Sequence, residues 1–130
     1  MRNAVYWVEL PVKDFDRAKQ FYETVFEVII KLAPIPRGRK YGIFPLDVKA
    51  LGAGLALVEG TGYEPTDTGS ILYIDRGESL DGPLSRVETA GGKILLPKVE
   101  NSGGSGFIAQ FRDSEGNRVG LHSSDESLQE

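Results

Sequence analysis

Hydrophobic and polar residues alternate along this chain in patterns that are typical of strands in some stretches and of helices in others. Residues 5–10 alternate, which predicts a strand with Trp7 and Glu9 on the same side. Apolar residues at helical spacing come after Asp14, a residue suited to a helix N-cap, and predict a helix over 15–26. Short apolar and β-branched runs then predict three strands, at residues 28–32, 40–46 and 54–59.

The same order of patterns returns after residues 60–69, a glycine-containing segment without apolar periodicity. We predict a strand over 70–75 and a helix over 82–90 with Asp81 as its N-cap. Three further strands are expected, at residues 93–97, 107–112 and 117–122. The two halves open at Val5 and Ile71, 66 residues apart, which suggests an internal duplication.

The repeated order predicts an α+β fold made of two βαβββ modules. We expect a single domain over residues 1–130, with modules at 4–59 and 70–123 and a linker at 60–69. Each module has a sheet with a helix on one face, so the other face needs cover from the second module or from a partner chain. A concave cavity between the modules would be the natural site for a small ligand.

Composition narrows the classes of function. The chain has no cysteine, which excludes disulfides and thiolate chemistry. Its net charge is −4, and its one basic cluster is "RGRK", residues 37–40. This cluster is either a solvated loop or an anion site, and we expect no nucleic-acid partner. The first residues contain no long apolar run, so we expect no signal peptide, no membrane partner and a cytoplasmic location.

Several stretches together resemble the glyoxalase/bleomycin-resistance/dioxygenase superfamily, also called the vicinal oxygen chelate superfamily. They are "WVELPVKDFDRAKQFYETVFE", "ILYID", "LSRVETAGGKILLPK" and "GFIAQFRDSEGNRVGLHS". The resemblance implies paired βαβββ modules in an open curved barrel, and a homodimer. In metalloenzymes of the superfamily, the first and last strands of each module each supply one metal ligand.

The resemblance places the four ligand positions of this chain at Trp7, Ala56, Ser70 and Gly120. Indole, methyl and hydrogen give a divalent ion no donor, and a neutral serine is a poor ligand. His122 is the only histidine of the chain. We therefore predict no cofactor. One histidine per chain leaves open a divalent metal that takes one ligand from each subunit of a dimer.

Strand parity predicts which side chains face the cavity. If Val119 and Leu121 pack under a helix, Gly120 and His122 face the other way. Glu9 and His122 could then act as a base and an acid on a substrate, or could simply neutralise each other or lie in water at the rim. As ligand-binding residues we predict Trp7, Val58, Ser70 and Leu72.

Two classes of function remain open at this point. The first is a glyoxalase-like lyase or isomerase that acts on a small carbonyl or thiol-adduct substrate. The second is a non-catalytic protein that binds a drug or metabolite, because a tryptophan on a concave face can stack on a planar or cationic ligand. Both classes imply a small-molecule partner.

Overall fold

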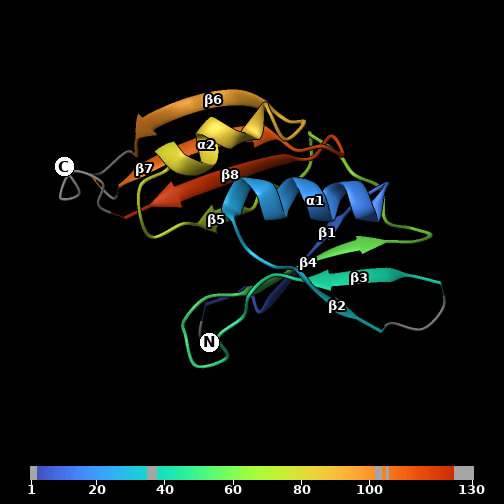
Figure 1. Ribbon diagram of the computed structural model, residues 1–130. Coiled ribbons are helices and arrows are strands. Elements are labelled where there is room, and N and C mark those ends of the chain that lie inside the picture. Colours follow the sequence, from blue (N-terminus) through green and yellow to red (C-terminus); the bar gives the residue numbers. More distant parts are fainter. Residues whose placement is uncertain (1–2, 35–37, 102–103, 105, 125–130) are drawn as a thin grey trace. The chain divides into compact units, whose positions relative to one another are not determined.

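The computed structural model describes residues 3–34, 38–101, 104 and 106–124. Arg37 of the basic cluster and the last residues of the polar tail lie outside this part of the chain. The chain divides between Pro65 and Thr66 into two compact units, at a point inside the predicted linker. Figure 1 labels the helices and strands of both units.

The first unit is a four-stranded sheet with one helix. It contains β1 (Trp7–Pro11), α1 (Phe15–Phe26), β2 (Lys31–Ala33), β3 (Lys40–Ile43) and β4 (Gly54–Glu59). The strand order is β1-β4-β3-β2, with β1 parallel to β4 and the other pairs antiparallel. Helix α1 lies along one face of this sheet (Figure 1).

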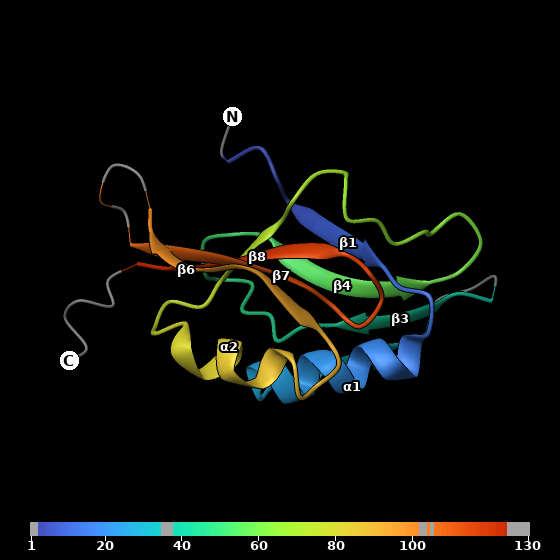
Figure 2. The same ribbon diagram turned by 90° about the horizontal axis from the view of Figure 1, so that it is seen from above.

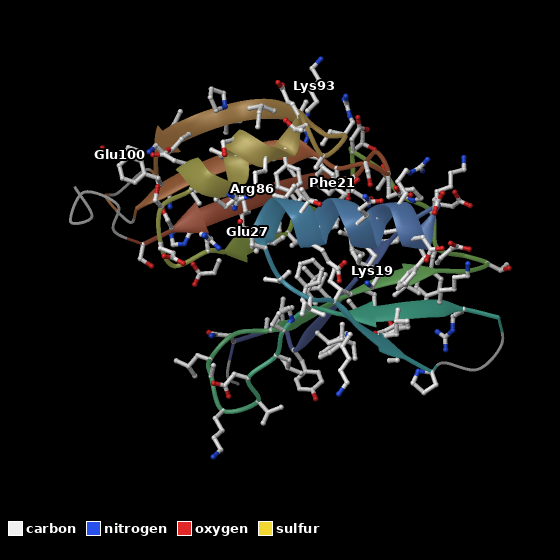
Figure 3. All side chains as sticks on the ribbon, viewed as in Figure 1. Lys19, Phe21, Glu27, Arg86, Lys93 and Glu100 are labelled. Atoms are coloured by element: carbon white, nitrogen blue, oxygen red, sulfur yellow. The ribbon has the colours of Figure 1, made fainter. Side chains whose placement is uncertain are left out.

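Helix α1 spans the range that its periodicity predicts. Asp14 caps it by accepting a hydrogen bond from the Arg17 backbone N–H at 3.1 Å. The carboxylate of Glu59 on β4 accepts from the Phe15 N–H at 2.8 Å, so the sheet itself supplies a second cap. The helix ends at Glu27, which has a left-handed backbone with φ of 55°. Figure 3 labels Lys19, Phe21 and Glu27 along it. Its buried stripe is the predicted one: Phe15, Ala18, Phe21, Tyr22, Val25 and Phe26.

The second unit repeats this order. It contains β5 (Tyr73–Asp75), α2 (Asp81–Val87), β6 (Lys93–Glu100), β7 (Phe107–Arg112) and β8 (Arg118–Ser123). The strand order is β5-β8-β7-β6, with only β5 and β8 parallel. Helix α2 lies along one face of this sheet (Figure 2), and Lys93 and Glu100 mark the two ends of β6 (Figure 3). The α+β class with two βαβββ modules is therefore confirmed.

The turn between β7 and β8 is built around a buried pair of polar side chains. One carboxylate oxygen of Asp113 accepts from the backbone N–H groups of Glu115 and Asn117, each at 2.9 Å. The Asn117 side chain donates to Asp113 at 3.1 Å and accepts from the Thr66 N–H at 3.0 Å. The second unit thus holds the end of the predicted linker through this turn.

Several predicted boundaries are wrong. Strand β1 runs from Trp7 to Pro11 rather than over 5–10, and β5 is only Tyr73–Asp75 rather than 70–75. Just before β5, the Gly120 N–H of β8 donates to the Leu72 carbonyl at 2.8 Å. This single hydrogen bond does not extend the strand pairing to residues 70–72.

Helix α2 also differs from its prediction. Leu80, not Asp81, occupies the N-cap position, and Asp81 lies in the first turn. The helix ends at Val87 rather than at 90. Turns follow it, in which the Ala90 N–H bonds to the Arg86 carbonyl and the Gly92 N–H to the Val87 carbonyl, with Gly91 at a φ of 110°. No helix among the described residues is long and apolar enough to cross a membrane.

The remaining boundary differences are smaller. Strands β2 and β3 are Lys31–Ala33 and Lys40–Ile43 rather than 28–32 and 40–46. Strands β6 and β8 each extend past the predicted end, to Glu100 and Ser123.

Candidate functional site

The carboxylate of Glu9 lies on the face of the first sheet that α1 does not cover. Its neighbour Leu10 pairs in register with Leu57, which pairs with Gly42. A Cβ atom on Gly42 would meet Phe15 of α1, so this row of the sheet faces the helix. Because side chains alternate along a strand, Glu9 faces the other way.

Two phenols hold the Glu9 carboxylate. The Tyr41 hydroxyl donates to Oε2 at 2.9 Å, and the Tyr63 hydroxyl donates to Oε1 at 3.2 Å. The network continues at both ends, because the Trp7 indole N–H donates to the Tyr41 oxygen at 2.9 Å and Arg39 donates to the Tyr63 oxygen at 3.1 Å. We call these five residues the Glu9 cluster.

Local backbone features place the members of the cluster. The Trp7 ring lies directly against Gly54, its register partner on β4, where any Cβ atom would collide with the ring. A turn closed by the Tyr63 N–H and the Gly60 carbonyl, at 3.1 Å, brings Tyr63 back to the sheet. The φ of 90° at Gly62 suits this turn.

The surroundings of Tyr41 in the cluster keep its phenol group neutral. Burial raises the pKa of Tyr41, and its hydrogen bond to Glu9 raises it further. Tyr41 therefore remains protonated at neutral pH and donates to Glu9 rather than acting as a base. The hydrogen bonds to Glu9 are open to solvent, so the carboxylate is accessible to a ligand.

A hollow of about 310 Å³ lies beside the cluster in the first unit, and it shares Arg39 and Tyr41 with it. Its other lining residues are partly apolar and partly charged: Phe15, Asp16, Leu32, Ala33, Pro34 and Lys40. We place the candidate site at the cluster, where polar groups converge, and regard the hollow as room beside it.

The second sheet carries its own polar groups on the corresponding face. Val119 and Leu121 are fully buried, which supports the predicted parity of Gly120 and His122. His122 Nδ1 lies 3.2 Å from a carboxylate oxygen of Asp75, its register partner on β5.

Tyr73 of the second sheet repeats the arrangement of Trp7. Its ring lies against Gly120, and its oxygen accepts from Gln110 at 2.6 Å. Gln110 in turn accepts from Arg118 at 2.9 Å. The first and last strands of each unit therefore place an aromatic ring over a glycine.

The predicted site residues have different surroundings in the structure. Val58 is fully buried in the row of Tyr41, its register partner. Ser70 and Leu72 precede β5. Within β5, Asp75 pairs with His122 and Tyr73 pairs with Gly120. The partners found for Glu9 lie in the first unit and the one for His122 in the second, and the direct pairing of these two stays a prediction.

Sequence reasoning missed Arg39, Tyr41, Tyr63 and Asp75 as site residues. One signal was present for Asp75, because it lies 66 residues after Glu9, the offset between the two halves. Arg39 belongs to the basic cluster considered as an anion site. Tyr63 gave no signal, since its segment has no periodicity.

Comparison with known proteins decides the family. The family model of the Glyoxalase/Bleomycin resistance protein/Dioxygenase superfamily matches residues 4–121. The chain belongs to this superfamily. No curated protein shows a significant sequence match.

Solved structures of the superfamily share the fold. A glyoxylase/bleomycin resistance protein/dioxygenase domain from Frankia sp. EAN1pec is 25% identical, with a TM-score of 0.68 over 97% of this chain and 95% of that one. The fosfomycin resistance protein FosX from Listeria monocytogenes is 20% identical, with a TM-score of 0.64 over 99% and 98%. An E144Q mutant of glyoxalase I from Zea mays is 23% identical, with a TM-score of 0.69. This chain is covered to 96% there but spans only 48% of the maize protein.

The residues at the superfamily's metal positions do not fit a divalent ion. The resemblance places these positions at Trp7, Ala56, Ser70 and Gly120, and in the structure Trp7 pairs with Gly54 and Gly120 pairs with Tyr73. An indole, a methyl group, a neutral hydroxyl and a hydrogen at these four positions give a divalent ion at most one weak donor. Among the described residues, no three His, Cys, Asp or Glu side chains gather as a metal site would require.

Proposed function

We propose that this superfamily member binds a small organic molecule on the helix-free face of its first sheet, at the Glu9 cluster. The observation that carries this proposal is a solvent-accessible carboxylate held in place by two phenols and, through Tyr41, by an indole. Aromatic rings around a carboxylate suit a positively charged or planar group. The net charge of −4 favours the approach of such a ligand.

A purely structural role for the cluster explains less. The large buried side chains Phe15 and Leu57 lie on the other side of the sheet, and Val58 is the buried residue in the row of Tyr41. The two hydrogen bonds to Glu9 are exposed and add little to stability, since water competes for their groups. Its convergence on one accessible carboxylate is typical of a binding site.

Fluorescence titration tests this proposal, because Trp7 is the only tryptophan. Benzyltrimethylammonium, benzylamine and an amino acid such as phenylalanine serve as probes. We expect saturable quenching with at least one of them, weakened about tenfold or more in Glu9→Gln, as for loss of a charge-assisted contact. Glu64→Gln, an exposed change outside the cluster, is the control. Equal binding by the native protein and Glu9→Gln would refute the site.

A second candidate function, a lyase or isomerase, rests on Asp75 and His122. A carboxylate at Nδ1 fixes the tautomer and orientation of an imidazole, which suits it for proton transfer. In a hemithioacetal, such a pair could take the proton from the carbon that carries the hydroxyl and return it to the neighbouring carbonyl carbon. The hydroxyl proton then moves to the former carbonyl oxygen, which leaves a thioester beside a hydroxyl group. The substrate would be a small carbonyl compound or a thiol adduct.

Turnover of a hemithioacetal made from a small 2-oxoaldehyde and a thiol tests the catalytic candidate. We expect His122→Gln to reduce kcat by roughly 10²-fold to 10⁴-fold, with a smaller loss in Asp75→Asn. Lys49→Gln on an exposed loop is the control. Turnover that persists in His122→Gln would show that His122 is not the proton-transfer group. No turnover in the native protein would leave binding as the only function.

We also propose a cytoplasmic homodimer. Large apolar side chains stand exposed on the described chain, among them Tyr6, Val48 and Leu51, and a two-fold partner could cover such surface. Light scattering at micromolar concentration should give twice the chain mass of 14.2 kDa. A stable monomer at that concentration would contradict the assembly.

A further inference from the structure

We infer that the ligand of the Glu9 cluster is a zwitterion that carries an ammonium group and an acid group close together. This inference rests on the proposed function and adds the chemical class of the ligand. It comes from the arrangement of Glu9 and Arg39 around a single atom, the Tyr63 hydroxyl oxygen.

The Glu9 carboxylate and the Arg39 guanidinium both contact that oxygen but do not form an ion pair with each other. Tyr63 donates its proton to Glu9 at 3.2 Å and accepts from Arg39 at 3.1 Å. Within the part of the chain that the structure describes, neither Glu9 nor Arg39 has an opposite charge within the 4 Å of an ion pair. The phenol therefore separates two charged groups and leaves each to be completed from outside.

Both groups keep capacity for a ligand. A carboxylate accepts about four hydrogen bonds, and Glu9 receives two. A guanidinium has five N–H donors, and Arg39 uses one in this cluster. Tyr63 has only one proton, and Glu9 takes it, so the phenol adds no further donor to the site.

The spacing suits an α-amino acid or a close analogue. Because Glu9 and Arg39 contact the same oxygen, their nearest charged atoms lie no farther apart than the two contact distances together. The ammonium nitrogen and the carboxylate oxygens of an α-amino acid are about 3 Å apart, as bond lengths dictate. One such molecule can donate to Glu9 and accept from Arg39 at once.

The same arrangement disfavours ligands with a single charge. A simple cation at Glu9 would face the Arg39 guanidinium, and a simple anion at Arg39 would face the Glu9 carboxylate. Packing against Gly60 keeps the Arg39 side chain near the cluster. The Arg39 Cγ atom lies 2.8 Å from the position that a Cβ atom on Gly60 would take. The site thus selects for the pair of charges.

Three matched compounds test the inference by Trp7 fluorescence: phenylalanine, phenethylamine, which lacks the acid, and 3-phenylpropionate, which lacks the amine. We expect phenylalanine to bind about tenfold or more tighter than either single-charge analogue. In Arg39→Gln, phenylalanine should no longer bind more tightly than phenethylamine. In Glu9→Gln, it should no longer bind more tightly than 3-phenylpropionate. Lys49→Gln and Glu64→Gln make the same charge changes at exposed positions outside the cluster and should leave the ranking unchanged.

The outcomes separate this inference from the proposed function. Binding of phenethylamine as tight as that of phenylalanine, lost in Glu9→Gln, would keep the binding site but overturn the zwitterion. An advantage of phenylalanine that survives in Arg39→Gln would overturn it as well. If neither these three compounds nor the benzyl cations quench Trp7 fluorescence saturably, both the inference and the proposed function are overturned.

Discussion

Two glycines leave room for aromatic rings to contact the sheets, Gly54 for Trp7 and Gly120 for Tyr73. A side chain at either position would need the space that the ring fills. The rings thus occupy the strands on which the resemblance places metal ligands. Single residues explain both the loss of a ligand set and the presence of an aromatic surface.

Gly54→Ala tests this packing. The added methyl group would force the Trp7 ring away and break its hydrogen bond to Tyr41, at a cost of about 1–3 kcal/mol for overpacking. We expect a shifted Trp7 emission spectrum and a lower free energy of unfolding. Gly69→Ala, whose Cβ atom would make only an ordinary contact with Thr66, is the control. An unchanged spectrum in Gly54→Ala would show that the ring does not lie where we place it.

Prediction from sequence reached only part of the site at this scale. Trp7 and Glu9 were found because alternation shows which side chains of one strand share a face. Tyr63 could not be found, since it reaches Glu9 through a turn 54 residues farther along the chain. Contacts of this kind depend on strand pairing and turn geometry, which local patterns do not encode.

At the scale of single elements, helix α1 was predictable because its cap and its buried stripe are both local signals. Its range was predicted too, but the left-handed backbone of Glu27 that ends it was not, since Glu27 is not a glycine. That conformation costs a residue with a Cβ atom roughly 1 kcal/mol or more relative to glycine.

Substitution at Glu27 measures this strain. Glu27→Gly and Glu27→Ala both remove the side chain, so its contacts are lost equally in the two variants. We expect Glu27→Gly to be more stable than Glu27→Ala by about 1 kcal/mol, the reverse of their order inside a helix. Chemical denaturation provides the comparison. Greater stability of the alanine variant would mean that the helix does not end at Glu27.

The pH dependence of stability should show the contribution of Glu23. Burial alone would raise the pKa of Glu23, but the Ile30 N–H and Lys19 outweigh it and bring the pKa below its ordinary value of 4.5. Its contribution is therefore present above that value and is lost as the pH falls through the folded-state pKa.

We expect Glu23→Gln to weaken the pH dependence of the unfolding free energy between about pH 5 and about pH 3. Glu64→Gln, at an exposed position, should leave it close to that of the native protein. Identical pH profiles for the two variants would show that Glu23 does not favour its charged form in the folded state.

At the scale of the whole molecule, the duplication was visible from the sequence because each module repeats one order of elements. The 66-residue offset also relates Trp7 to Tyr73 and Gly54 to Gly120. The chemistry of the two sheets has nevertheless diverged. The first sheet presents the Glu9 cluster, and the second presents Asp75 and His122.

Ligand binding should be independent of metal ions. The residues at the superfamily's metal positions offer almost no donors, so we expect dissociation constants to stay within about twofold after EDTA treatment, a difference of less than about 0.5 kcal/mol. Fluorescence titration before and after dialysis against EDTA gives the comparison. Loss of binding, restored by one divalent ion per chain, would contradict this expectation.

The central claim is that a small molecule binds at the Glu9 cluster. Trp7 gives the only indole N–H signal in a ¹⁵N-labelled sample, and this group donates to Tyr41 within the cluster. Titration of the labelled protein with phenylalanine should shift this signal together with the amides of residues 39–41 and 60–63. Shifts confined to residues 107–123, with the indole signal unmoved at saturation, would contradict the account.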